Sequence, residues 1–139
     1  MEVQVNLLAV LAAMASSMVV GSIWYAMPVF GNKWAKLAKI DMSKDRGSVA
    51  KPIITTMVVS LITAYVLAHV SYLSNQFFQN SFLQDSLTTA FWMWLGFTAA
   101  RFITHDAFEG RPAKLTTINI GNEFATFMLM GLVIGVIGV

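Results

Sequence analysis

The sequence predicts an all-α integral membrane protein: a bundle of four transmembrane helices with short loops and both termini outside the cytoplasm. Three observations lead to this prediction. Hydrophobic residues make up 57% of the 139 residues and charged residues only 12%, whereas a soluble domain carries charge on about a quarter of its residues. The apolar residues lie in four long stretches. The segments that connect or flank these stretches on one side of the predicted membrane contain no basic residue.

Each apolar stretch is long enough to cross a bilayer, which takes roughly 20 residues of helix. The first ends before Pro28 and the second begins after Pro52. A secretory signal peptide is the alternative for the first stretch, but residues 1–4 carry no positive charge. We predict one domain over residues 1–139, with spans at residues 5–27, 53–73, 87–106 and 115–138.

The distribution of Lys and Arg predicts the orientation. Six of the nine basic residues lie in the first loop, and the other three lie at the end of the third span or in the third loop. Cytoplasmic loops carry the excess of Lys and Arg, so loops 28–52 and 107–114 should face the cytoplasm. The basic residues are Lys33, Lys36, Lys39, Lys44, Arg46, Lys51, Arg101, Arg111 and Lys114.

Aromatic residues lie near the predicted ends of the spans. Trp24 and Tyr25 close the first span, and Trp92 and Trp94 lie in the outer part of the third. Trp and Tyr favour membrane interfaces, so we expect these four side chains there. The segment around Trp34 is either a short interfacial helix or a solvated basic loop.

Small residues recur at four-residue spacing along the spans, which allows close helix approach in lipid. Two interpretations stay open: these seams pack the four helices against one another, or the last pair forms a dimer interface. The candidates are Ala9, Ala13, Ser17 and Gly21 in the first span and Gly131 and Gly135 in the fourth.

Glu123 lies near the middle of the fourth span, where an ionisable side chain needs a partner or water. Asn119 shares its helical face and Asn122 is adjacent. Arg101, in the inner part of the third span, is the expected partner, and His69 lies nearer the outer surface. These residues form either a buried ion pair that fixes helix register or a polar path for a proton or cation.

A charged rim is predicted at the cytoplasmic mouth, formed by His105, Asp106, Glu109 and Arg111. His105 and Glu109, four residues apart on one helical face, supply two potential metal ligands without a third, so we predict no metal site.

The chain lacks the motifs of several function classes. It has no cysteine, nucleotide-binding glycine loop, nucleophile elbow or zinc signature. We therefore expect no catalytic residues, no cofactor and no nucleic-acid partner. Two hypotheses remain: a structural or accessory subunit, and a small transporter or channel. The expected partners are the lipid bilayer and further copies of the chain.

Five stretches of the chain, taken together, form a recognisable pattern: VNLLAVLAA (5–13), GSIWYAMPVFGNKW (21–34), YVLAHV (65–70), FWMWLGF (91–97) and FEGRPAKL (108–115). In these stretches the chain resembles the bacterial membrane-protein family catalogued as domain of unknown function 1761. The resemblance implies a compact multi-helix fold in the bacterial inner membrane and no established activity. His69 falls in the third stretch, and Glu109 and Arg111 in the fifth; the fourth span departs more from the family around Glu123.

Overall fold

The computed structural model describes residues 3–41 and 50–138, and every regular element in that part of the chain is helical. The predicted all-α class is therefore confirmed. Lys44 and Arg46 of the first loop lie outside the described residues. In chain order the elements are α1 (Leu7–Trp24), η1 (Met27–Gly31), α2 (Asn32–Leu37), α3 (Ala50–Phe78), α4 (Phe82–Met93), η2 (Trp94–Ala99), α5 (Ala100–Phe108) and α6 (Ala113–Ile137), where η1 and η2 are π-helical.

Three of these helices are long and apolar enough to cross a membrane: α1, α3 and α6. They coincide with the first, second and fourth predicted spans. The third predicted span falls on α4, η2 and α5, which follow one another without a gap in the chain. The π-helical segment divides this run, so neither of its α-helices reaches the length of a span by itself.

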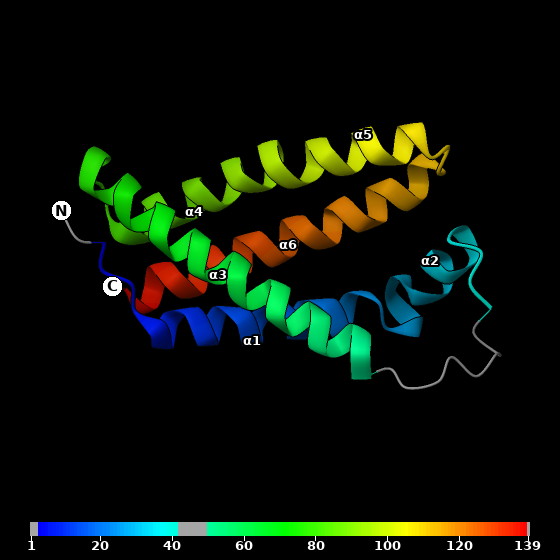
Figure 1. Cartoon of the computed structure of the whole chain (residues 1–139), viewed down its shortest axis with the longest axis horizontal. Helices are drawn as coiled ribbons and strands as arrows, with labels where there is room; N and C mark the ends of the chain where they lie inside the picture. Colours follow the sequence, from blue (N-terminus) through cyan, green and yellow to red (C-terminus); the bar gives the residue numbers. More distant parts are fainter. Residues whose placement is uncertain (1–2, 42–49, 139) are drawn as a thin grey trace.

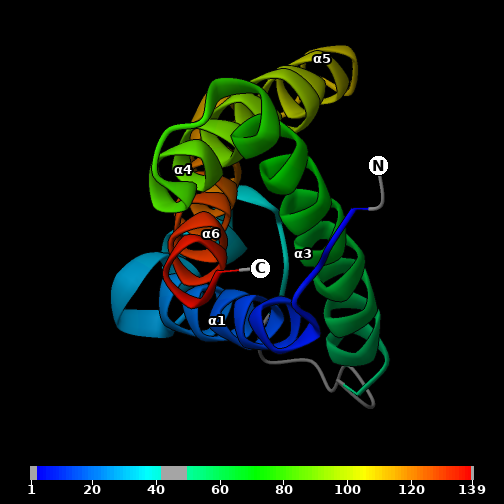
Figure 2. The same ribbon diagram turned by 90° about the vertical axis from the view of Figure 1, so that its left-hand side faces the viewer.

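α6 is the central helix of the bundle. It packs against α1 on one side and α4 on the other, while α3 packs against α4 and α1. Figures 1 and 2 show α3 crossing the bundle obliquely from α4 toward α1. The chain ends and the α3–α4 turn lie at one end of the bundle, and α2 and the α5–α6 turn lie at the other (Figure 1). The basic side chains of α2 and the α5–α6 turn therefore gather at one end.

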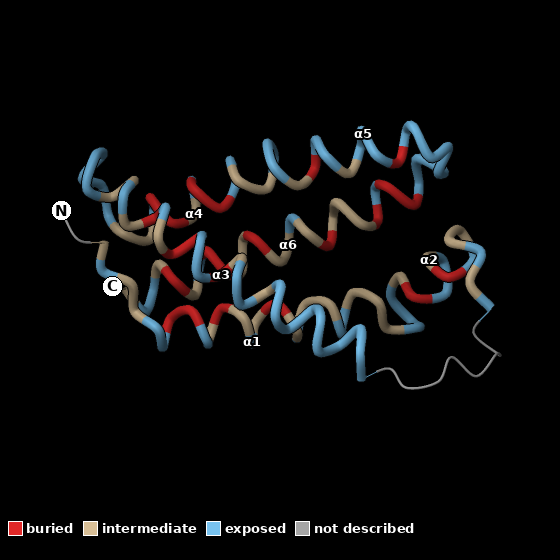
Figure 3. Tube along the Cα trace, viewed as in Figure 1, coloured by how far each residue is buried: buried red, intermediate tan, exposed pale blue. Residues whose placement is uncertain are grey.

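The core combines small residues on the outer helices with larger residues on α6. Ala13, Ala64 and Ala90 are buried on α1, α3 and α4 and pack around Phe127 and Met130. Burial runs along the inner face of α6, whereas the first ten residues of α3, 50–59, are all exposed (Figure 3). The beginning of α3 therefore stands apart from the core.

Gly131 and Gly135 bring α6 close to α4. A Cβ at Gly131 would lie 2.8 Å from the Cβ of Ala90, and one at Gly135 would lie 2.7 Å from the Cα of Leu83. This face therefore packs against α4 within the chain, as the first interpretation of the seams expects, and a dimer through it stays a prediction. On α1, Ala9, Ala13 and Ser17 are buried, whereas a Cβ at Gly21 would meet nothing within 4 Å.

The α3–α4 turn is shorter than predicted, because α3 ends at Phe78 and α4 begins at Phe82. The sequence suggested a loop over residues 74–86, since that segment is polar. Its polar side chains instead bond to one another: Asn75 Nδ2 and Asn80 Nδ2 donate to the two carboxylate oxygens of Asp85 at 2.8 and 3.0 Å. Asp85 is 2% exposed.

A glycine sets the corner between α1 and α2. The backbone N–H of Gly31 donates to the carbonyl of Ala26 at 3.0 Å, and a Cβ at Gly31 would lie 2.9 Å from that oxygen. This tight corner folds α2 back so that Trp34 meets Tyr25, with ring centroids 5.4 Å apart. The segment around Trp34 is thus helical.

Candidate functional site

Glu123 lies ten residues after the start of α6, which places it about 15 Å along the helix axis. Two tryptophans hold this part of α6. Trp24 Nε1 donates to the carbonyl of Ile118 at 3.1 Å, and Trp94 Nε1 donates to that of Ile120 at 3.0 Å. Trp24 and Trp94 therefore turn their N–H groups toward α6, and together they fix its position relative to α1 and η2.

Tyr25 joins Glu123 in a polar cluster. Its hydroxyl donates to Asn119 Oδ1 at 3.1 Å, and its ring packs on Trp34. Asn122 is the neighbour of Glu123 in the chain and is 8% exposed. The cluster thus combines one carboxylate, two amides and one phenol, contributed by the end of α1 and the middle of α6.

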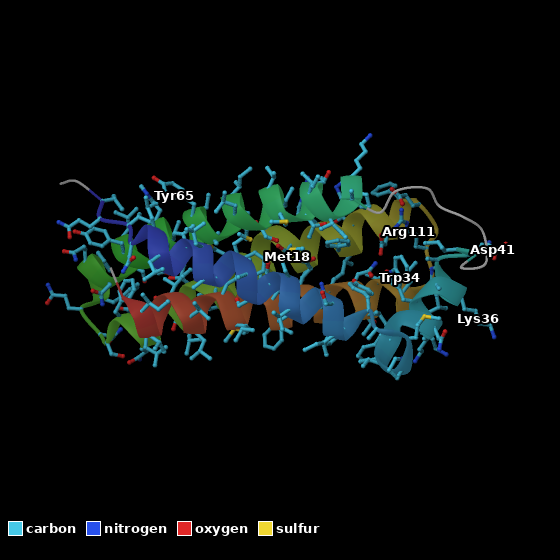
Figure 4. The ribbon with its side chains drawn as sticks, turned by 90° about the horizontal axis from the view of Figure 1, so that it is seen from below. Met18, Trp34, Lys36, Asp41, Tyr65 and Arg111 are labelled. Carbon is cyan, nitrogen blue, oxygen red and sulfur yellow. The ribbon has the colours of Figure 1, made fainter. Side chains whose placement is uncertain are left out.

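A cavity of about 660 Å³ extends from this cluster to the basic end of the bundle. We call it the loop-end cavity. Tyr25, Asn119 and Glu123 line its inner part, and Lys39 and Arg111 line its outer part. In Figure 4, Trp34, Lys36, Asp41 and Arg111 mark this end, whereas Tyr65 lies at the opposite one. The basic end therefore has an opening that reaches Glu123.

Two of the stretches that carry the family resemblance meet across the loop-end cavity. Tyr25 and Trp34 come from the stretch over residues 21–34, and Glu109, Arg111 and Leu115 come from the stretch over residues 108–115. Segments far apart in the sequence therefore build one cavity.

A second cavity of about 770 Å³ lies between α1, α3 and α6, and we call it the helix groove. Tyr25, Trp34 and Glu123 line both cavities, so the two meet at these side chains. Met18, Val59 and Phe127 are among the apolar side chains of the groove. Glu123 therefore lies where a polar opening joins a largely apolar one.

The expected ion pair between Arg101 and Glu123 is not formed among the residues that the structure describes. The Asp106 carboxylate accepts a hydrogen bond from Thr116 on α6, so the face of α5 that carries Asp106 is directed toward α6. Arg101 precedes Asp106 by five residues, which turns it about 140° away at 100° per residue. It is exposed and lines a separate cavity with His105.

Three of the four predicted rim residues come together at the α5–α6 turn. Arg111 Nε lies 2.6 Å from Glu109 Oε2 and 3.7 Å from Asp106 Oδ1. Thr116 Oγ1 donates to Asp106 Oδ2 at 2.7 Å. His105 is exposed, and the described ranges contain no group of three His, Cys, Asp or Glu side chains that could hold a metal ion.

His69 lies apart from this site. Its ring centroid is 6.2 Å from that of Tyr65 on the same helix, and it lines neither the loop-end cavity nor the helix groove. The polar cluster includes Asn119, Asn122 and Glu123 from the predicted set but neither His69 nor Arg101.

The sequence interpretation left Tyr25 out of the site, and it also left out Asp85, a buried polar residue of the α3–α4 turn. From the sequence, Tyr25 was expected at the membrane interface, because hydropathy indicates how deep a residue lies in the bilayer but not which helix its side chain contacts. For Asp85 a signal existed: Ser81 and Gln84 form the S-x-x-Q pattern that begins a helix, and Ser81 Oγ does accept from the backbone N–H of Gln84 at 3.3 Å.

Comparison with known proteins gives one match. The family described as "Protein of unknown function (DUF1761)" matches residues 8–135, which include the whole polar cluster and both resemblance stretches at the loop-end cavity. No curated protein and no solved structure matches the chain. The chain therefore belongs to the DUF1761 family, as its sequence stretches predicted.

Proposed function

We propose that this chain is a small membrane transporter or channel in which Glu123 binds a proton or a cation. The observation that carries the proposal is a cavity that runs from the basic end to a carboxylate in the middle of α6. No cationic side chain among the described residues pairs with that carboxylate. The proposal assigns no covalent chemistry to the chain.

The physical argument concerns the charge on Glu123. A carboxylate at this depth of a bilayer is unfavourable by about 3 kcal/mol or more unless it is paired, hydrated or protonated. A structural role requires a dry carboxylate held by a fixed cation, and Arg101 faces elsewhere. The loop-end cavity instead offers a route by which water and ions can reach Glu123. The accessory-subunit hypothesis therefore loses its main support.

Reconstituted vesicles test the proposal. Vesicles that contain the wild-type chain should dissipate an imposed pH or potassium gradient faster than empty vesicles. Glu123→Gln removes the charge at nearly constant volume and should lower the flux at least about tenfold, while Glu123→Asp should retain part of it. The measurement is the fluorescence of an entrapped pH dye.

Thr117→Val is the matched control, since Thr117 is exposed on the same helix and lines neither cavity. It should leave the flux unchanged. Wild-type vesicles no leakier than empty ones to protons, sodium and potassium would contradict the proposal and return the accessory-subunit hypothesis to first place.

We also propose that α4, η2 and α5 together form a fourth crossing, and that the basic end faces the cytoplasm of a bacterial inner membrane. The run from residue 82 to residue 108 is about 40 Å long at 1.5 Å per residue, enough to cross the hydrocarbon. The basic residues of the described chain support the sidedness.

The absence of cysteine makes this topology directly testable by labelling single cysteines with a membrane-impermeant maleimide. In intact spheroplasts Gln76→Cys should be labelled, whereas Lys36→Cys and Lys114→Cys should react only after permeabilisation. All three positions are exposed. Labelling of both Gln76→Cys and Lys114→Cys from outside would show that the α4–α5 run does not cross.

A further inference from the structure

We infer that the helix groove between α1, α3 and α6 binds a lipophilic organic monocation that enters from the bilayer. The inference rests on the proposed function, because Glu123 supplies the charge that balances the ligand, and it adds the class of substrate and the side of entry. Four features of the groove support it: its size and walls, its hydrogen-bonding groups, its charge and its opening.

The size and walls of the groove suit an organic molecule rather than a bare ion. Its volume of about 770 Å³ is within the range of roughly 300–1,000 Å³ typical of small-molecule sites. Met18, Ile53, Val59, Phe127 and Met130 supply apolar walls. Trp34 adds an aromatic face, which favours cations. An alkali ion would need a cage of oxygen atoms in place of these walls.

Five serine and threonine hydroxyl groups of the groove present oxygen lone pairs, because their protons are already used. Each donates to a carbonyl of its own helix, at 2.7–3.0 Å: Ser17 to Met14, Ser22 to Met18, Thr55 to Lys51, Thr56 to Pro52 and Thr63 to Val59. The Tyr25 hydroxyl donates to Asn119 in the same way. These oxygens can only accept further hydrogen bonds or contact a positive charge.

The buried amide at the groove points to the same ligand chemistry. Asn122 is 8% exposed, and its Oδ1 accepts no hydrogen bond from the described residues. A buried acceptor without a partner is unfavourable, and a donor or cation in the groove relieves it. Among the described residues that line the groove, Glu123 beside Asn122 is the only one with a carboxyl group and none has a basic group, so a single positive charge is matched.

The groove opens toward the side of the bundle. Residues 50–59 of α3 are all exposed, including Ile53 at 47% and Val59 at 55%. Figure 2 shows the beginning of α3 lying beside the bundle rather than within it. Gly21, on the α1 wall, has no heavy atom within 4 Å of the position of a Cβ. In a bilayer this opening faces lipid, where a lipophilic cation concentrates.

Equilibrium binding of tetraphenylphosphonium to the full chain in lipid nanodiscs tests the inference. The wild type should bind this cation saturably. It should bind tetraphenylborate, an anion of the same shape, at least about tenfold more weakly. Glu123→Gln should weaken cation binding by a similar factor, since removing one member of a buried charge pair has effects of this size.

A pair of glycine variants tests whether the cation occupies the groove, independently of the charge on Glu123. Gly21→Leu places a side chain on the groove wall, at a position where a Cβ meets nothing within 4 Å, and should abolish binding of the cation. Gly96→Leu is its control, because a Cβ at Gly96 also meets nothing within 4 Å and Gly96 lines none of the described cavities. It should bind as the wild type does.

The outcomes separate this inference from the proposed function. Absence of tetraphenylphosphonium binding, equal binding of the anion, or unchanged binding by Gly21→Leu would each overturn the inference. Glu123-dependent proton flux in the same preparation would then leave the proposed function standing. Saturable, groove-dependent binding without any flux would support the inference and overturn transport.

Discussion

Gly131→Leu is expected to destabilise the bundle by about 3 kcal/mol or more, because α6 has no room for a side chain at that position. A Cβ there would lie 2.8 Å from Ala90 Cβ and 3.1 Å from the backbone oxygen of Ser86. Backbone cannot rotate away as a side chain can, so α4 and α6 must separate. Overpacking of this kind typically lowers stability by about 1–3 kcal/mol, and leucine adds three further carbons.

The measurement is the unfolding of the purified chain in mixed micelles, followed by far-UV circular dichroism. Gly96→Leu is the control, since it introduces the same side chain where space is open. A paired exchange makes the test sharper: Gly131→Ala combined with Ala90→Gly should be more stable than Gly131→Ala alone. If Gly131→Leu unfolds at the wild-type concentration of denaturant, the close α4–α6 approach is wrong.

Asp85→Ala is expected to destabilise the α3–α4 hairpin by about 3 kcal/mol or more. The substitution removes the acceptors of Asn75 Nδ2 and Asn80 Nδ2, and hydrogen bonds to a charged group each contribute about 1.5–3 kcal/mol. Asp85 also lies in the first turn of α4, where the helix dipole favours a negative charge. The loss should appear as faster amide hydrogen exchange around residues 79–85.

Gln84→Ala is the matched control for Asp85→Ala, because Gln84 is exposed in the same turn of α4 and its side chain makes none of these bonds. It should leave both exchange and global unfolding close to wild type. Equal exchange in the two variants would show that Asp85 does not hold the hairpin.

The sequence predicted the helical class, and three of the predicted spans coincide with helices long and apolar enough to cross a membrane, because long apolar stretches are a strong signal of such helices. It misplaced the α3–α4 turn for a physical reason. A hydropathy pattern assigns a polar segment to a loop. Here, however, the polar side chains of Asn75 and Asp85 lie on adjoining helices and form a hydrogen bond with each other. A π-helical segment such as η2 has no characteristic composition, so the sequence did not predict that η2 divides the third helical run.

The candidate site was only partly predictable. Periodicity correctly put Asn119 and Glu123 on one face of their own helix, since that depends on local geometry alone. Whether Arg101 reaches them depends on how α5 is rotated, and the Asp106–Thr116 bond sets that rotation. Such contacts between helices, including those of Trp24 and Trp94 with α6, carry no signal in a single sequence.

The central position of α6 has a consequence for biosynthesis. α6 is the last of the described helices to leave the ribosome, yet α1 and α4 both pack directly on it. Chains are elongated at about 5–20 residues per second, so the faces of α1 and α4 that contact α6 lack this partner for seconds. Assembly of the bundle is therefore completed from the carboxyl side.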